Sequence, residues 1–191
     1  MYTIKENINN IIEIKNSKFI CCLYKVYDIN DIDKYLDKTR DTYKDATHYC
    51  YAYIIDDKKK FSDDNEPGGT AGSPILQVLE KKELNYILCV VVRYFGGIKL
   101  GAGGLVRAYS KSVSNCLDKA NIINLVRGKN IDIIFSYDKV KIIDNLLKNS
   151  IILNKEFKEE IRYNVNISNK DYDSIKNMVD IVFNKDIYIE K

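Results

Sequence analysis

Apolar and polar residues alternate along the first 27 positions, in "YTIKENI" and "IIEIKNSKFICCLYKVY". Side chains that alternate in this way point to opposite faces of a strand, so the pattern predicts two or three β-strands. The spacing then becomes helical. Ile29, Ile32 and Leu36 fall on one helical face, and Asp28 or Asn30 is suited to cap a helix of about a dozen residues.

The middle of the chain changes between strand and helix patterns. "HYCYAYII" and "YILCVVV" are short apolar runs rich in aromatic or β-branched residues, which predicts two strands. Residues 56–72 between them are predicted as a loop, after which Ser73 and Pro74 are suited to start a helix. After the second strand and a glycine-rich segment, residues 104–120 have helical periodicity.

Beyond residue 125 the predicted order is strand, helix, strand, strand, helix, strand. The strands are "NIDIIFSY", "IILNKEF", "EIRYNVNIS" and "DIYIE", and the helices cover residues 138–149 and 171–184. This βαββαβ order is the ferredoxin-like plan, a four-stranded antiparallel sheet with both helices on one face. We therefore predict an α+β fold with one domain over residues 1–127 and a second over 128–191, separated near "NLVRGKN".

Composition and charge narrow the classes of function. At 191 residues and 46% apolar content the chain can bury a core, and its net charge of +3 is too small for a general polyelectrolyte. Positive charge is local instead, because residues 84–117 contain four cations and no acid. Five cysteines without C-x-x-C spacing and a single His argue for buried, reduced thiols rather than zinc or disulfides. Because the N-terminus lacks a leader pattern and no apolar run could span a membrane, we expect a cytoplasmic protein without membrane contact.

The glycine-rich segment "RYFGGIKLGAGG" follows a strand and opens a helix, which is an arrangement that suits anion binding. It matches neither the Walker A loop nor the Rossmann fingerprint. A generic anion site remains, in which backbone amides lie among cations that no nearby acid neutralises. The alternative is that the glycines only permit close packing and positive φ angles. The predicted anion- or RNA-binding residues are Arg93, Gly96, Gly97, Lys99, Gly101, Gly103, Gly104 and Arg107.

A second group of candidate residues is His48, Asp63, Asp64 and Glu66. One interpretation of these three acids and one His is a site for magnesium-assisted phosphoryl chemistry. Acids beside Pro-Gly-Gly are more often turn and cap residues, however, and a lone His is more often structural. We therefore expect no bound metal and no cofactor, and we assign no catalytic residue.

Three segments together resemble the YigZ/IMPACT family: "DATHYCYAY", "FSDDNEPGGTAGSPILQVL" and "VVVRYFGGIKLGAGGLVRAYSKSV". One departure is Asn65, where the family usually has Gly, although Asn also tolerates a left-handed turn. The resemblance implies an N-terminal ribosomal-protein-like domain, similar to the fourth domain of elongation factor G, and a C-terminal ferredoxin-like domain similar to its fifth. It also implies that the eukaryotic relatives act in translational control through ribosome-associated partners. It assigns no activity or catalytic role to the two-domain bacterial members.

These observations lead to one main hypothesis about function and two alternatives. The main hypothesis is a non-enzymatic RNA- or ribosome-binding protein that modulates translation, with phosphates against residues 93–107. One alternative is a small hydrolase or transferase acting on a phosphate-containing or peptide substrate, with His48 and the nearby acids as its chemical groups. The other is a module that binds only a protein partner.

Overall fold

The computed structural model describes residues 1–190 and confirms an α+β fold. The chain divides into two compact units, Met1–Ile123 and the residues from Asn124 onward. The predicted domains, 1–127 and 128–191, place the boundary four residues later than this division. The assignment of these residue ranges to two domains stays a prediction. In residues 1–190, no helix is both long enough and apolar enough to cross a membrane.

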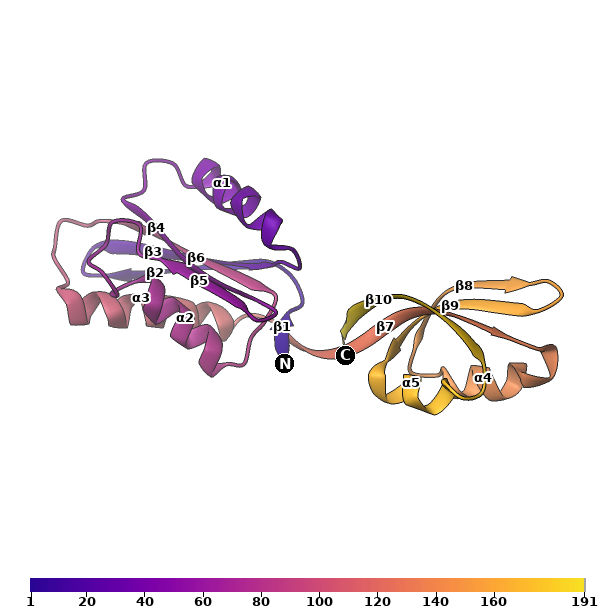
Figure 1. Cartoon of the computed structure of the whole chain (residues 1–191). Helices are drawn as coiled ribbons and strands as arrows, with labels where there is room; N and C mark the ends of the chain where they lie inside the picture. Colours follow the sequence, from indigo (N-terminus) through magenta and orange to yellow (C-terminus); the bar gives the residue numbers. More distant parts are fainter. Residues whose placement is uncertain (191) are drawn as a thin grey trace. The chain divides into compact units, whose positions relative to one another are not determined.

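The first unit contains a five-stranded antiparallel sheet in the order β2-β3-β6-β4-β5 (Figure 1). Its strands are β2 (Ile8–Ile14), β3 (Ser17–Lys25), β6 (Ile87–Tyr94), β4 (His48–Ile55) and β5 (Lys58–Ser62). A short strand, β1 (Tyr2–Ile4), bridges to Leu84 at the end of this unit's α2–β6 connection. This sheet and β1, which lies outside it, together account for every strand that the sequence predicted before residue 100.

Helices cover both faces of this sheet. The helix α1 (Ile32–Thr42) follows a 3₁₀ turn, η1 (Ile29–Asp31), and lies on one face, whereas α2 (Gly72–Lys81) and α3 (Ala102–Leu117) lie on the other (Figure 1). The strand β6 is apolar from Ile87 to Val92 because it is central in the sheet and its two faces meet different helices. This strand carries the chain directly from the core to the glycine-rich segment.

The second unit has the predicted βαββαβ order. Its elements are β7 (Ile122–Phe135), a 3₁₀ turn η2 (Tyr137–Lys139), α4 (Val140–Leu146), β8 (Ile151–Phe157), β9 (Ile161–Ser168), α5 (Asn169–Ile175) and β10 (Asp180–Glu190). The strands β10, β7, β9 and β8 pair in that order, and every pair is antiparallel. Both helices lie on one face of this sheet (Figure 1), where Ile143 and Ile175 share a core with Tyr163.

Two sequence predictions about element boundaries are wrong. The helix expected over 171–184 ends at Ile175, because Asp180 onward pairs with β7 and the sheet determines the conformation there. The expected loop 56–72 contains β5, which local propensity disfavours because three of its five residues are Lys. The segment 124–130, which the sequence predicted as the domain boundary, forms part of β7, and a Cβ added at Gly128 would be 2.4 Å from a β9 carbonyl oxygen.

Candidate functional site

Residues predicted for the two separate sites line a single cavity of the first unit. The cavity has a volume of about 390 Å³. Its lining includes His48 at the start of β4, Glu66 from the loop before α2, and Arg93, Lys99 and Gly101 from the end of β6 and the glycine-rich segment. His48 and Arg93 face each other in the β4–β6 register, which explains why segments 45 residues apart meet here.

Arg93 and Glu66 form a buried ion pair in this cavity. Arg93 Nη1 donates to Glu66 Oε1 at 2.5 Å, and the two side chains are only 5% and 3% exposed. Tyr109 Oη donates to the same carboxylate oxygen at 2.8 Å. The expectation that no acid neutralises Arg93 is therefore wrong, because the balancing acid lies 27 residues earlier in the chain. Arg93 is a buried, paired cation rather than an exposed phosphate contact.

The guanidinium of Arg93 also lies between two aromatic rings. Its central carbon is 5.4 Å from the ring centroids of both Phe19 and Phe95. Its Nη2 is 3.5 Å from Ser17 Oγ, at the limit of a hydrogen bond. Its buried Nε has no hydrogen-bond partner within the part of the chain that the structure describes. An unpaired buried donor is uncommon, so this atom marks an incompletely satisfied position in the cavity wall.

His48 has a defined hydrogen-bonding orientation. Its Nδ1 is 2.8 Å from the backbone oxygen of Asp64. A carbonyl oxygen only accepts, so Nδ1 carries the proton and Nε2 of the neutral ring is an acceptor. Nε2 lies 3.8 Å from Glu66 Oε1, and the His48 side chain is 16% exposed. The histidine therefore presents an acceptor to the polar end of the cavity.

The carboxylates of Asp63 and Asp64 are occupied by backbone amides. Asp63 accepts from the N–H groups of Gly69, Ala71 and Gly72 at 2.8, 3.0 and 2.8 Å, so it caps the start of α2 in place of the predicted Ser73. Asp64 accepts from a backbone N–H of β4 at 2.6 Å. Among residues 1–190, no group of three or more His, Cys, Asp and Glu side chains is arranged to hold a metal ion. These two acids act as turn and cap residues.

The glycines of the segment serve different purposes. A Cβ at Gly96 would lie 2.1 Å from backbone atoms of the β2–β3 turn, so this position requires close approach. Gly97 and Gly101 have φ angles of +83° and +70°. Gly103 and Gly104 form the first turn of α3, where the nearest atom to an added Cβ at Gly103 is 3.6 Å away. Close packing thus explains Gly96, and backbone conformation explains Gly97 and Gly101.

Two predicted cations remain exposed and unpaired. Within residues 1–190, Lys99 and Arg107 have no ion-pair partner. Arg107 Nη1 lies 3.6 Å from the Cβ position of Gly103, so its guanidinium is beside the first turn of α3. The N-cap of this helix, Gly101, has no side chain that could occupy the first amides. Positive charge and free amide donors are therefore concentrated at one helix end.

Comparison with known proteins decides the family. The sequence pattern of the Impact N-terminal domain matches residues 15–117, which is more than half of the chain. The chain belongs to the IMPACT family. It is 40% identical over 174 residues to the IMPACT family member YvyE of Bacillus subtilis, a match that covers 90% of this chain and 78% of the relative.

Two further comparisons differ in how much of the chain they cover. The family member YigZ of Escherichia coli is 43% identical over 110 residues, which are 55% of this chain and 54% of that relative. The chain thus spans about half the length of this second relative. A crystal structure described as that of a hypothetical protein covers 96% of this chain and 97% of its own, with 28% identity and a TM-score of 0.66.

Sequence reasoning missed Tyr109 and Phe95 in this IMPACT family cavity. Tyr109 was predicted only as part of the apolar face of α3, yet its hydroxyl donates to Glu66. Burial raises the pKa of Tyr109 far above its ordinary value, and burial raises the pKa of the neighbouring Cys50 thiol to about 12. Phe95 lines the cavity and is 45% exposed. The sequence feature that could have identified Phe95 is its position as a large aromatic residue next to two glycines.

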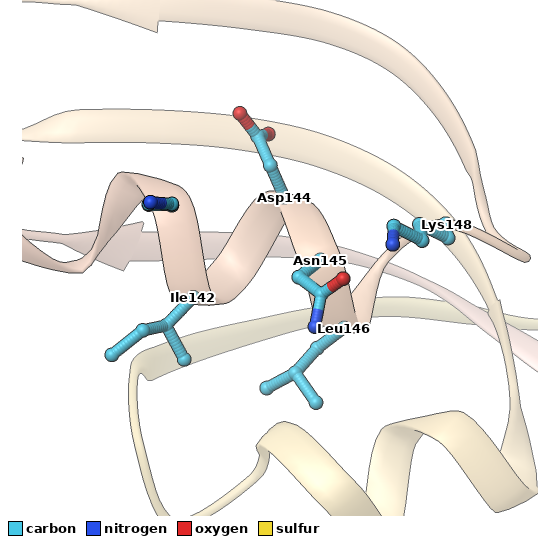
Figure 2. A pocket seen from close by; sticks show the side chains of 6 residues that line it. Ile142, Asp144, Asn145, Leu146 and Lys148 are labelled. Atoms are coloured by element: carbon cyan, nitrogen blue, oxygen red, sulfur yellow. The ribbon is translucent and has the colours of Figure 1, made fainter.

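A larger hollow lies over α4 of the second unit, with a volume of about 660 Å³. Six residues of α4 and the following turn line it, all between positions 141 and 148. Figure 2 shows that Asp144 points away from Ile142 and Leu146. Because the polar groups of its lining do not converge, we take the smaller cavity at His48 and Arg93 as the candidate site.

Proposed function

We propose that this IMPACT family protein is a non-enzymatic RNA- or ribosome-binding protein of the cytoplasm that modulates translation. The end of the glycine-rich segment and the start of α3 would contact phosphate groups. The translational role of the eukaryotic relatives, which the family resemblance implies, agrees with this proposal. A protein partner that belongs to the translation machinery is compatible with it as well.

The observation that carries the proposal is the pair of exposed cations at the start of α3. Lys99 and Arg107 have no acidic partner among residues 1–190, and the first amides of α3 are free of a side-chain cap. A helix N-terminus carries about half a positive charge, and free amides there suit phosphate oxygens. Arginine adds paired donors in a fixed plane. Of the three cations that the sequence predicted here, Lys99 and Arg107 are kept as phosphate contacts, and Arg93 is dropped because it is paired with Glu66.

The test is RNA binding at several salt concentrations, with one single-stranded and one structured RNA. If Lys99 and Arg107 each contact one phosphate, Lys99→Ala and Arg107→Ala should each lower the salt slope by roughly 0.7 to 1. Lys34→Ala is the matched control, because Lys34 is an exposed lysine of α1 on the opposite face of the sheet. Unchanged affinity and slope in folded Lys99→Ala and Arg107→Ala proteins would contradict the proposal.

His48 supports a second candidate function, a small hydrolase or transferase. Its fixed tautomer leaves Nε2 as a possible base beside the cavity. The nearest thiol and phenol, Cys50 and Tyr109, are poor nucleophiles because burial raises both of their pKa values. Phosphate release or peptide cleavage by the wild-type protein that disappears in His48→Gln would favour this candidate over RNA binding.

A further inference from the structure

The cavity beside α3 has an apolar wall and a polar end. Phe95, Leu100 and Leu105 provide apolar lining, whereas His48 and Glu66 provide acceptors. Its volume of about 390 Å³ lies within the range of roughly 300–1,000 Å³ that is usual for small-molecule sites. A ligand that fits must combine an apolar or aromatic body with a polar edge that donates hydrogen bonds.

Phe95 offers a rigid, exposed aromatic surface in this wall. The residue is 45% exposed, and the guanidinium carbon of Arg93 is 5.4 Å from its ring centroid. Its backbone N–H donates to Thr47 Oγ1 at 3.0 Å, which fixes the chain at the exit of β6. A ring that is already held in place loses little conformational entropy when a planar group stacks on it. The feature is therefore suited to a nucleobase.

The charge around the cavity favours an anionic ligand. Glu66 is balanced by Arg93, so the uncompensated side-chain charge of the lining is that of Lys99. The helix α3 begins shortly after Lys99, and no side chain caps the backbone amides of its first residues, Ala102 and Gly103. A phosphate linked to a stacked base would meet donors and a cation at once.

We propose that the cavity receives a single nucleotide, with its base stacked on Phe95 and its phosphate at Lys99 and the first turn of α3. This inference deepens the proposed function and rests on it for one point, that the nucleotide belongs to an RNA chain. A free nucleotide would offer the same base and phosphate groups to the cavity. The acceptors His48 Nε2 and Glu66 select bases that carry amino groups. Guanosine and cytidine monophosphates should therefore bind more tightly than uridine monophosphate.

A fluorescent variant makes the binding measurable. The chain contains no Trp, so Phe95→Trp introduces one tryptophan at the stacking position. Stacking of a base should quench its fluorescence on titration with guanosine monophosphate, whereas inorganic phosphate alone should not. Phe95→Leu, followed by calorimetry, should weaken nucleotide binding by roughly 5- to 150-fold, which is the usual effect of losing one stacked base. Lys34→Ala is the matched control, because Lys34 is an exposed lysine of α1 on the opposite face of the sheet and does not line the cavity.

The outcomes separate this inference from the proposed function. If nucleotides fail to bind while RNA binds in an Arg107-dependent way, the nucleotide pocket is wrong and RNA binding stands. If nucleotide binding depends on Phe95 and RNA does not bind, the cavity is a site for a free nucleotide and the proposed RNA binding is wrong. Equal binding of phosphate and nucleotide overturns the inference, and so does Phe95-dependent binding of an acidic peptide in place of nucleotides. Failure of both nucleotide and RNA binding overturns both proposals.

Discussion

Replacing Glu66 by Gln should destabilise the first unit strongly, although the side chain keeps its size. The carboxylate and the guanidinium of Arg93 are 3% and 5% exposed, so water cannot take over the role of either partner. Arginine stays charged in proteins, and its alternative acceptor, Ser17 Oγ, is already at 3.5 Å. Stranding a buried charge in this way costs about 3–5 kcal/mol of unfolding free energy.

Urea unfolding followed by circular dichroism measures the loss of stability. Hydrogen exchange of peptides from β4 and β6 assigns that loss to this sheet. Adding Arg93→Met removes the stranded charge, so the double variant should be more stable than Glu66→Gln alone. The matched control is Glu80→Gln, because the exposed pair Lys59–Glu80 should contribute less than about 1 kcal/mol. A cost within about 1 kcal/mol for Glu66→Gln would show that the pair is solvated and would refute the reasoning.

Four further predictions concern the same chain. Gly96→Ala should cost about 1–3 kcal/mol because the added Cβ meets backbone atoms, whereas Gly103→Ala, whose Cβ would make only an ordinary contact at 3.6 Å, should stabilise by about 0.5–1 kcal/mol; thermal melts compare them directly. Asp63→Asn should cost about 0.5–2 kcal/mol through the lost α2 cap, and excess magnesium should leave the wild-type melting temperature unchanged; an upward shift would contradict the cap assignment. All five cysteines are buried, and burial raises the pKa of Cys50 to about 12, so a thiol reagent at mildly alkaline pH should label the protein in urea but not in its native state. Partial burial acts to raise the pKa of Asp132, but hydrogen bonds from β9 side chains outweigh it and lower that pKa below its ordinary value. The free energy of unfolding should therefore fall as pH drops below about 4, and this loss should be smaller in Asp132→Asn.

The predictable part of the fold follows from strong local patterns. The apolar run that becomes β6 and the periodicity of α3 are long and regular, so packing and propensity favour the same structure. Where they disagree, packing with the sheet decides, as in β5, which is rich in lysine, and in the first residues of β10. Prediction from one sequence cannot include these partners, because each strand is fixed by neighbours far along the chain.

The candidate site was predictable as a set of residues but not as an arrangement. The family resemblance grouped His48, Glu66 and Arg93, and the structure brings all three to one cavity. The sequence alone could not predict the ion pair between Arg93 and Glu66. This pair depends on the β4–β6 register and on a loop that returns to the sheet. An arginine in an acid-free window therefore looked exposed when it is buried. Lys99 and Arg107 needed no such long-range partner, and their exposure was predictable.

The strand β5 has a consequence for how molecules of this protein meet one another. It is the last strand of its sheet, so one side of its backbone has no hydrogen-bonding neighbour. Lys58, Lys59 and Lys60 are all exposed along this border. Two copies that approached border to border would bring like charges together before their backbones could pair. The lysines that made this strand difficult to predict from the sequence are therefore expected to oppose edge-to-edge pairing of two copies at β5.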